Sequence, residues 1–315
     1  MTRLVVLFLD GVGLGEDNAD TNPLAVADLP VLHGLLSGQR LLAETVRSGM
    51  LHTTQASLVP TDACLGVRGR PQSATGQTAL ITGRNAAQLL GQHFGPRPNA
   101  ALRALLQEPT LFSQALAQGH SAAFANAYPP DYFAAVARGK RLHGALPFAA
   151  QAAGLPLRTA EDLAAGRALS VDLTNAGWRS DLGYPAMPLW TPQQAGAVAA
   201  GLAATYDLLF FDNWAPDMAG HRGDKEPAIA LLQDFDAFLG GLLAALDLNS
   251  TLVAITSDHG NIEALSVRGH SENAVPTVLI GAGHAQAAGN IHSLTDLLPA
   301  FLAVLNHREQ RLIGN

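Results

Sequence analysis

Residues 4–13 read Leu-Val-Val-Leu-Phe-Leu-Asp-Gly-Val-Gly, and this stretch decides the fold. Its first six residues, Leu4–Leu9, form a short and wholly apolar run, which is the pattern of a strand buried on both faces of a parallel sheet. Asp10 and Gly11 end the run with a turn. Similar apolar runs recur at Ala122–Ala125, Leu208–Phe211, Leu252–Thr256 and Val275–Ile280.

Sequence patterns typical of helices lie between these runs, at Leu111–Gln118, Pro192–Ala204, Pro227–Leu246 and Ser293–Leu305. Strands that alternate with helices predict an α/β fold, a three-layer sandwich with a mostly parallel central sheet. In such sheets ligands bind beyond the carboxyl ends of the strands. Because polar residues follow several of the apolar runs directly, we expect the functional site at this edge of the sheet.

Residues 128–189 follow a different pattern, without clear alternation of strands and helices. They include Pro129-Pro130, the basic stretch Arg138–Arg141 and Tyr184-Pro185 between short alanine-rich pieces. We therefore predict a small cap or insertion at residues 128–189. Residues 1–127 and 190–315 would together form a metal-binding catalytic core.

The composition limits the classes of partner. The chain has 315 residues, of which 48% are hydrophobic, close to the globular norm, and only 14% charged, below the typical ~25%, so we expect a packed globular protein. A net charge of −7 argues against nucleic acid or an anionic membrane as a partner. No run reaches the ~18 apolar residues of a membrane span, and the first apolar run is too short for a signal peptide, so we expect a cytoplasmic protein. Cys64, the single cysteine, excludes an intramolecular disulfide framework and a cysteine-based zinc site. No feature of the sequence sets an oligomeric state.

The glycine-rich stretch Asp10–Gly15 invites comparison with a dinucleotide-binding loop. That interpretation fails, because Glu16 occupies the position of the third glycine and the acidic residue precedes the glycines. An aspartate at the carboxyl end of a strand, followed by a flexible loop, is better suited to binding a metal ion.

A second loop, Pro71–Gly76, leads into a predicted helix at Gln77–Thr82. It lacks the lysine and the first glycine of a phosphate-binding P-loop. The hydroxyls of Ser73 and Thr75 would lie near a helix N-terminus, where backbone N–H groups favour an anion or an attached phosphate. The alternative is that one of them only caps the helix.

Three aspartates and three histidines complete the pattern. Asp217 and His221 are four residues apart, so one helical turn would present both to one ion. Asp258 and His259 follow an apolar run, and His270 comes shortly afterwards. Each pair alone could be an ordinary hydrogen-bonded pair. With Asp10 they suffice for two sites with nitrogen and oxygen ligands, which suit Zn²⁺ or Mn²⁺, and two close metal ions favour displacement at phosphorus.

Taken together, these residues resemble the metalloenzyme branch of the alkaline phosphatase superfamily, which includes the cofactor-independent phosphoglycerate mutases and the phosphopentomutases. The five matching blocks, in the family's order, are the first metal-binding aspartate loop at Leu9–Gly13, the nucleophile segment from Gln72 to Gly83-Arg84, D-x-x-G-H at Asp217–His221, D-H-G-N at Asp258–Asn261, and H-x-x-N-x-V-P at His270–Pro276.

The resemblance implies an alkaline phosphatase-like fold and two divalent metal ions, Mn²⁺ or Zn²⁺, with Mg²⁺ as a further option. The implied ligands are Asp10, Ser73, Asp258 and His259 for one ion, and Asp217, His221 and His270 for the other. The resemblance also implies that Ser73 is a nucleophile that forms a phosphoserine, with Thr75 as the alternative. The candidate substrate contacts are Gln77, Arg84, Arg138, Lys140 and Arg141.

Two departures from the family bear on the reaction. Gln77 stands where the mutases usually have histidine, and the predicted cap is much smaller than the second domain of the phosphoglycerate mutases. Because a small cap would do little to keep water out, the sequence favours a phosphohydrolase that acts on a small phosphate ester. The alternative is a phosphomutase of the phosphoglycerate mutase type, for which the basic stretch Arg138–Arg141 would hold a second anionic group. A third hypothesis is a metal-binding protein without catalysis.

Overall fold

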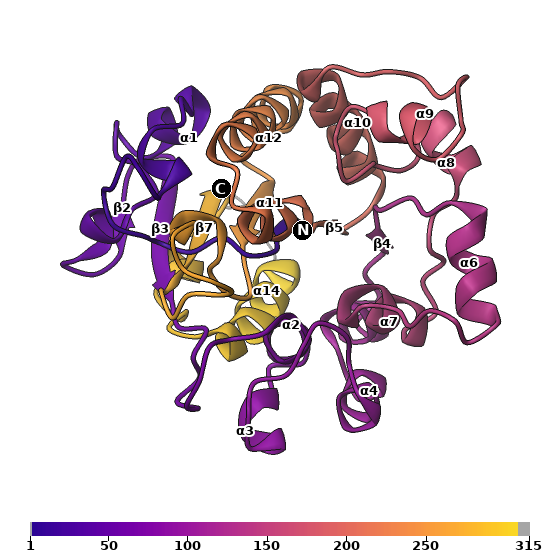
Figure 1. Ribbon diagram of the computed structural model, residues 1–315, viewed down its shortest axis with the longest axis horizontal. Helices are drawn as coiled ribbons and strands as arrows, with labels where there is room; N and C mark the ends of the chain where they lie inside the picture. Colours follow the sequence, from indigo (N-terminus) through magenta and orange to yellow (C-terminus); the bar gives the residue numbers. More distant parts are fainter. Residues whose placement is uncertain (1, 308–315) are drawn as a thin grey trace, which may run out of the picture.

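The computed structural model describes residues 2–307, and its centre is a seven-stranded sheet in the order β2-β3-β7-β6-β1-β5-β4 (Figure 1). Four neighbouring strands, β6, β1, β5 and β4, run parallel. The predicted α/β fold, with a sheet that is mostly parallel at its centre, is confirmed. The strands are β1 (Arg3–Leu9), β2 (Leu51–His52), β3 (Ala56–Thr61), β4 (Ala122–Phe124), β5 (Leu208–Asn213), β6 (Thr251–Thr256) and β7 (Val275–Gly281).

One side of the sheet departs from the prediction. β7 is antiparallel to β6, and β3 and β2 continue the sheet with antiparallel pairs. The reason for the β7 direction is the connection between β6 and β7, which contains only a short 3-10 helix, η3 (Ile262–Ala264), instead of the long crossover helix that a parallel return needs. The sequence did not predict β3, because Pro60 interrupts it and a proline argues against a strand interior.

Helices cover both faces of the sheet, so the molecule has three layers. In β1 the side chains alternate: Val5, Leu7 and Leu9 pack into the core on one face, and Leu4, Val6 and Phe8 pack into the core on the other. The first face is covered by α1 (Pro30–Leu35), α10 (Pro192–Thr205) and α12 (Lys225–Ala245). The second is covered by α2 (Ser73–Thr82), α5 (Leu111–Ala117), α7 (Ala145–Ala152), α13 (His284–Ala288) and α14 (Leu297–Asn306).

The remaining helices are short. They are α3 (Ala86–Leu90), α4 (Ala100–Gln107), α6 (Pro130–Ala137), α8 (Ala160–Ala164), α9 (Ala176–Ser180), α11 (Ala215–Arg222) and the 3-10 helices η1 (Pro23–Ala25), η2 (Ala43–Val46) and η4 (Leu294–Asp296). Ser293, the first residue of the predicted helix Ser293–Leu305, forms a capping box with Asp296 at the start of η4.

Among the described helices, α12 alone is long and apolar enough to pass a length and composition test for crossing a membrane. Its apolar side chains, including Phe235, Phe238 and Leu242, are buried in the core beneath α12, where the helix also packs against α10. A core helix that covers a sheet passes the same test, and these contacts account for its hydrophobicity.

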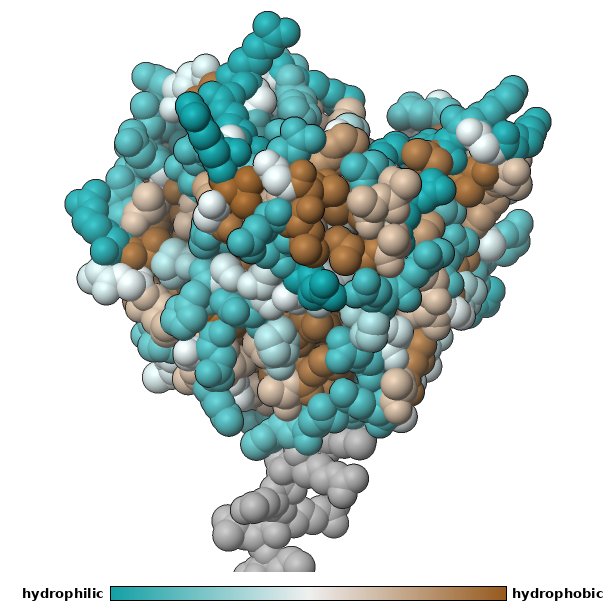
Figure 2. Space-filling model, turned by 90° about the horizontal axis from the view of Figure 1, so that it is seen from below, coloured by the Kyte–Doolittle hydropathy of each residue, from teal (hydrophilic) through white to brown (hydrophobic). Residues whose placement is uncertain are grey.

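Residues 128–189 contain α6 to α9 and no strand. α7 packs into the core on the second face of the sheet, whereas the region of α8 and α9 has a small apolar cluster of its own around Leu163, Trp178 and Met187. Figure 2, which keeps the left and right of Figure 1, shows a notch between the bulk of the molecule and the lobe on the right, the side on which Figure 1 places α6, α8 and α9. The division into a core and a cap stays a prediction.

Candidate metal centre

The predicted metal ligands come from the carboxyl ends of neighbouring strands. Asp10 directly follows β1, and Asp258 and His259 follow β6. Asp217 and His221 lie on α11, which begins shortly after β5. His270 lies in the loop before β7. Since β5, β1 and β6 are adjacent and parallel, their ends bring these side chains to one edge of the sheet.

The first group of ligand atoms is buried. The Nε2 atom of His259 lies 3.2 Å from Asp10 Oδ1 and 3.6 Å from Asp258 Oδ2. Ser73 Oγ lies 3.1 Å from the same nitrogen. Asp10, Asp258 and His259 each offer a ligand atom within 4.8 Å of the other two, a spacing that one ion could bridge.

The second group of ligand atoms belongs to Asp217, His221 and His270 and is more exposed than the first. The Nε2 atoms of both histidines face Asp217. Asp217 Oδ2 lies 3.3 Å from His221 Nε2, and Oδ1 lies 3.5 Å from His270 Nε2. The Nδ1 atom of His270 is 2.7 Å from the carbonyl oxygen of Pro71, which can only accept, so Nδ1 carries a proton and Nε2, which faces Asp217, is the nitrogen left for a metal ion.

His259 lies between the two groups. It offers a ligand atom within 4.8 Å of Asp217 and His270 as well, and its ring stacks on that of His270 with 3.7 Å between the ring centres. The structure thus brings all six predicted Asp and His ligands together in one continuous cluster.

The electrostatics of the cluster fit divalent cations. Burial, followed by the charges of Asp10 and Asp217, raises the pKa of Asp258 well above its usual range. No lysine or arginine among residues 2–307 forms an ion pair with these carboxylates. Crowded carboxylates and inward-facing imidazole nitrogens without a basic counter-charge are the donor set that a divalent ion requires.

The two other shifted groups respond to the same charges. Burial alone would raise the pKa of Asp217, but the hydrogen bond with His270 and the charge of His259 lower it to about 2. Burial alone would lower the pKa of His259, but its bond to Asp10 and the charges of Asp10 and Asp217 raise it.

The structure separates the two candidate nucleophiles. α2 begins at Ser73, four residues before the predicted start, so Ser73 lies in the first turn of the helix and its hydroxyl faces His259. Thr75 is fully buried, and its hydroxyl is bonded to backbone groups of Gln72 and Phe94 instead. Neither hydroxyl caps α2, because the N-cap residue is Gln72.

Gln77, a candidate substrate contact, lies against the ligand carboxylates. Its Nε2 atom donates hydrogen bonds to Asp10 Oδ2 at 3.0 Å and to Asp258 Oδ2 at 3.1 Å. The amide therefore fixes the orientation of both carboxylates relative to α2.

The basic candidates are scattered. Arg84 lies beyond the other end of α2, roughly 15 Å of helix from Ser73, and forms an ion pair with Glu108 at 2.7 Å, so the structure does not bring it to the metal ligands. Arg138 and Lys140 are exposed on the loop after α6. The guanidinium of Arg141 lies over the ring of Tyr132, 4.8 Å from its centre.

Sequence reasoning missed three side chains around the cluster. Asn261 donates to Asp217 Oδ1 at 2.7 Å, although only its place in the D-H-G-N block was noted. The buried carboxyl of Asp212 ends β5, and burial and the charge of Asp10 raise its pKa well above the usual range. Glu263 is 2% exposed, and its carboxylate accepts hydrogen bonds from the backbone nitrogens of Gly13 and Asn261. Asp212 directly follows an apolar run, which is the one signal that could have found it.

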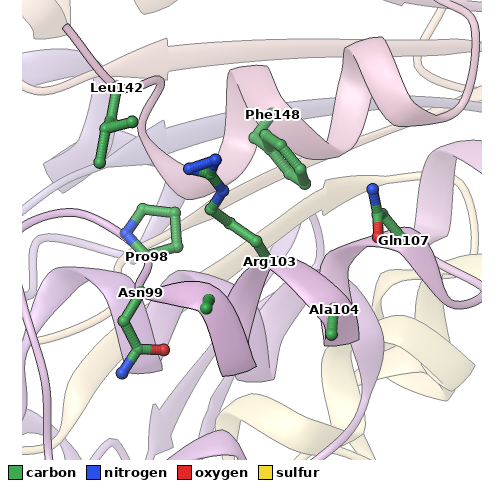
Figure 3. Close-up of a pocket in the computed structure, with 8 residues that line it drawn as sticks. Pro98, Asn99, Arg103, Ala104, Gln107, Leu142 and Phe148 are labelled. Atoms are coloured by element: carbon green, nitrogen blue, oxygen red, sulfur yellow. The ribbon is translucent and has the colours of Figure 1, made fainter. Parts of the chain in front are cut away.

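A surface pocket of about 390 Å³ lies between α4 and α7, away from the predicted ligands (Figure 3). Arg103 extends along it, with its guanidinium 5.6 Å from the centre of the Phe148 ring. None of the predicted site residues lines this pocket.

Comparison with known proteins supports the assignment of the class. Residues 193–307 match the model of the Metalloenzyme superfamily. The 2,3-bisphosphoglycerate-independent phosphoglycerate mutase of Dinoroseobacter shibae is 36% identical over 116 residues, which are 34% of this chain and 22% of the mutase. The 2,3-bisphosphoglycerate-independent phosphoglycerate mutase 2 of Methanothermobacter thermautotrophicus is 37% identical over 127 residues, which are 40% of this chain and 30% of that enzyme. The alignments thus span less than a third of these curated relatives.

Solved structures share the fold over nearly the whole chain. A protein from Pyrococcus horikoshii superimposes with a TM-score of 0.57 at 17% identity and covers 98% of both chains. The alkaline phosphatase from the Antarctic bacterium TAB5 gives a TM-score of 0.53 at 14% identity and covers 98% of this chain and 99% of that one. The family match, the relatives and the shared fold confirm the resemblance to the metalloenzyme branch of the alkaline phosphatase superfamily.

Proposed function

We propose that this protein is a two-metal phosphoryl-transfer enzyme that works through a phosphoserine at Ser73 and hydrolyses a small phosphate ester. The observation that carries the proposal is the position of the Ser73 hydroxyl, in the first turn of α2 and 3.1 Å from His259 Nε2. There it adjoins the cluster of carboxylates and imidazoles, and the N–H groups of the first turn favour the negative charge of a phosphoryl group.

Two divalent ions would be held by the predicted ligands. Asp10, Ser73, Asp258 and His259 would hold one, and Asp217, His221 and His270 the other. Nitrogen and oxygen ligands without cysteine favour Mn²⁺ or Zn²⁺, with Mg²⁺ as the alternative. When bound, such ions lower the pKa of a serine hydroxyl and neutralise charge on phosphoryl oxygens.

The bond changes in this proposal are simple. Ser73 Oγ loses its proton and bonds to phosphorus while the bond from phosphorus to the ester oxygen breaks, and the released oxygen takes up one proton, which balances the one lost by Ser73, to leave as an alcohol. Water then attacks the phosphoserine, which releases inorganic phosphate and restores the Ser73 hydroxyl. Thr75 stays the alternative nucleophile, but its bonds to Gln72 and Phe94 favour Ser73.

A phosphomutase is the second candidate, and a pair of arginines favours it. Arg97 donates to the carbonyl oxygen of Leu142 at 2.5 Å, which places it beside the loop that carries Arg141. Gly95, two residues before Arg97, lies close to the start of α2, where an added Cβ atom would come within 3.2 Å of the Gln72 side chain and 3.3 Å of the Ser73 backbone nitrogen. Neither arginine forms an ion pair with a residue in the described part of the chain. A mutase must hold a second anionic group while the phosphoryl group is on the enzyme, and two guanidinium groups without carboxylate partners would suit that task.

The remaining parts of the proposal concern the surroundings of the reaction. The partner would be a small phosphorylated molecule and not a nucleic acid or a membrane, in keeping with the net charge of −7. A cytoplasmic location stays a prediction.

A panel of esters tests the proposal. The chelator-stripped protein, reloaded with Mn²⁺ or Zn²⁺, is incubated with phosphorylated hydroxy acids, sugar phosphates, and sulfate and phosphonate esters. Products are followed by phosphorus NMR and by sulfate release. Free phosphate supports a hydrolase, and an isomer formed without free phosphate supports a mutase. Turnover of sulfate or phosphonate esters alone, or of none of the esters, would contradict the proposal, and the last result would leave a metal-binding protein without catalysis.

A further inference from the structure

A single buried carboxylate lies behind the metal centre and joins the loops that carry its ligands. Glu263 lies in η3 and is 2% exposed. Its Oε2 atom accepts hydrogen bonds from the backbone nitrogens of Gly13 at 2.9 Å and Asn261 at 2.8 Å. Its Oε1 atom accepts from Asn273 Nδ2 at 3.0 Å and from the hydroxyl of Ser271.

All four partners of Glu263 donate. The two backbone nitrogens and the amide nitrogen of Asn273 have no acceptor capacity, and the Ser271 hydroxyl already accepts from the Asn273 backbone, so its proton is free for Glu263. No arginine or lysine among residues 2–307 forms an ion pair with Glu263. Four donated bonds thus offset the burial of this carboxylate, and its role is that of an acceptor at a junction.

Each donor belongs to a segment that carries a proposed ligand. Gly13 is three residues after Asp10 in the loop that follows β1. Asn261 is two residues after His259, and its side chain also donates to Asp217. Ser271 is next to His270. Glu263 therefore joins the loop after β1 to both ends of the β6–β7 connection directly, and it reaches the helix α11 through Asn261.

The glycines of these loops make room for the carboxylate. A Cβ atom on Gly13 would lie 2.3 Å from Glu263 Oε1, and one on Gly260 would lie 2.1 Å from the same atom. Contacts this short force something to move, so a side chain at either position would displace Glu263. The glycine-rich stretch after Asp10, which does not fit a dinucleotide loop, is explained by this close approach.

We infer that Glu263 is a positioning residue of the metal centre, which sets the separation of the ligand-bearing loops and thereby the affinity for divalent ions. It acts through other residues and contacts neither of the proposed ions. The inference rests on the proposed function only in that it takes the same cluster as the metal site.

The test compares two buried carboxylates. Glu263→Gln keeps the shape but, in either orientation of the amide, places an N–H₂ group against at least one N–H group that can only donate. The control, Asp236→Asn, alters a carboxylate that is also 2% exposed and accepts from the backbone nitrogens of Val31 and Leu32, outside the ligand loops. The measurements are the Kd and stoichiometry for Mn²⁺ by calorimetry on chelator-stripped protein, and the Tm of the metal-free forms.

We expect both substitutions to lower the metal-free Tm, but only Glu263→Gln to weaken Mn²⁺ binding, by about 10- to 100-fold, the usual effect of losing a residue that orients metal ligands. Unchanged Mn²⁺ affinity in Glu263→Gln, or equal weakening in both variants, would overturn the inference. If Glu263→Gln does not fold, Ser271→Ala is the second variant, because it removes only one of the four bonds. We expect Ser271→Ala to weaken Mn²⁺ binding measurably, but by less than the effect expected of Glu263→Gln. A Kd equal to that of the unaltered protein would again overturn the inference.

The two proposals fail differently. An unaltered protein that binds no Mn²⁺ would contradict the proposed function and this inference together. An unaltered protein that binds two ions, with Glu263→Gln equal to it, would contradict the role of Glu263 alone.

Discussion

The ligand loops at the carboxyl ends of β1, β5 and β6 and the basic stretch Arg138–Arg141 differ in how firmly their polar side chains are held. Asp10, Asp258 and His259 are buried, and each contacts other segments of the chain. In residues 128–189, by contrast, Arg138 and Lys140 are exposed, and Arg138 bonds only to its own helix. Under the proposed function, the sheet edge would fix the chemistry, whereas the exposed stretch Arg138–Arg141 would be free to select a substrate.

The largest expected effect comes from His259, which lies within reach of both ligand groups. His259→Ala should lower the bound metal and reduce phosphoryl transfer by at least about 1,000-fold, because a group that helps to hold charge at the reacting phosphorus is lost. Metal content by plasma mass spectrometry and turnover of the best ester measure the two effects.

The matched control is His120→Ala. His120 is also buried, at 3% exposure, and bonds to Asn306 away from the ligand loops. It should lose stability but keep its metal. A His259→Ala protein that retained metal content and turnover would show that the ligands are wrongly assigned.

Removing the metal should make stability depend on pH. Each ion at 100 times its Kd contributes about 2.7 kcal/mol, so chelation should lower the Tm by roughly 5 °C for each ion removed. In the metal-free fold the pKa values of Asp258 and His259 are raised, so both favour the protonated form. The stabilisation that comes from binding these protons is present at low pH. It is lost as the pH rises through the raised pKa values, and the value for His259 lies above 6.5.

The Tm of the chelated protein should therefore fall as the pH rises above 6.5, and less so with Mn²⁺ bound, because bound ions displace these protons. Scanning calorimetry at several pH values measures this. Equal pH dependence with and without metal would mean that the ions do not bind at Asp258 and His259.

A smaller effect is expected from the arginines near residues 128–189. Arg97→Ala or Arg141→Ala should raise KM about 10-fold for a substrate with a second anionic group, with kcat less affected, because each removes one charge-assisted contact. Arg84→Ala, which breaks only the pair with Glu108, is the control and should change neither constant. Equal KM values for all three variants would show that Arg97 and Arg141 do not bind the substrate, and the argument for a mutase would then fail.

Local sequence was enough to predict most of the sheet and the ligand cluster. The apolar runs of β1, β5 and β6 lie directly before Asp10, Asp212 and Ser257-Asp258, so each strand and the polar residues at its end could be recognised in one stretch. α2 started earlier than predicted, since Gln72 makes no capping bond that would mark its beginning.

The missed features depend on contacts between distant parts of the chain. Gly13 and Glu263 are 250 positions apart, and only the folded loops bring them together. The position of Arg97 likewise depends on a contact with a distant residue, its hydrogen bond to the carbonyl oxygen of Leu142. The antiparallel direction of β7 follows from the connection between β6 and β7, a stretch that has no periodic pattern in the sequence.

The phosphoserine itself can be observed by intact-mass spectrometry of the metal-loaded protein, quenched in acid shortly after mixing with a substrate from the ester panel. The unaltered protein should gain the mass of one phosphoryl group, and Ser73→Ala should gain none while it keeps its fold and most of its metal. Thr75→Ala should still gain the phosphoryl mass, because the Thr75 hydroxyl is bonded to backbone groups, whereas the Ser73 hydroxyl faces His259. An adduct that persists in Ser73→Ala and disappears in Thr75→Ala would move the nucleophile to Thr75, and turnover without an adduct in any variant would contradict the covalent mechanism.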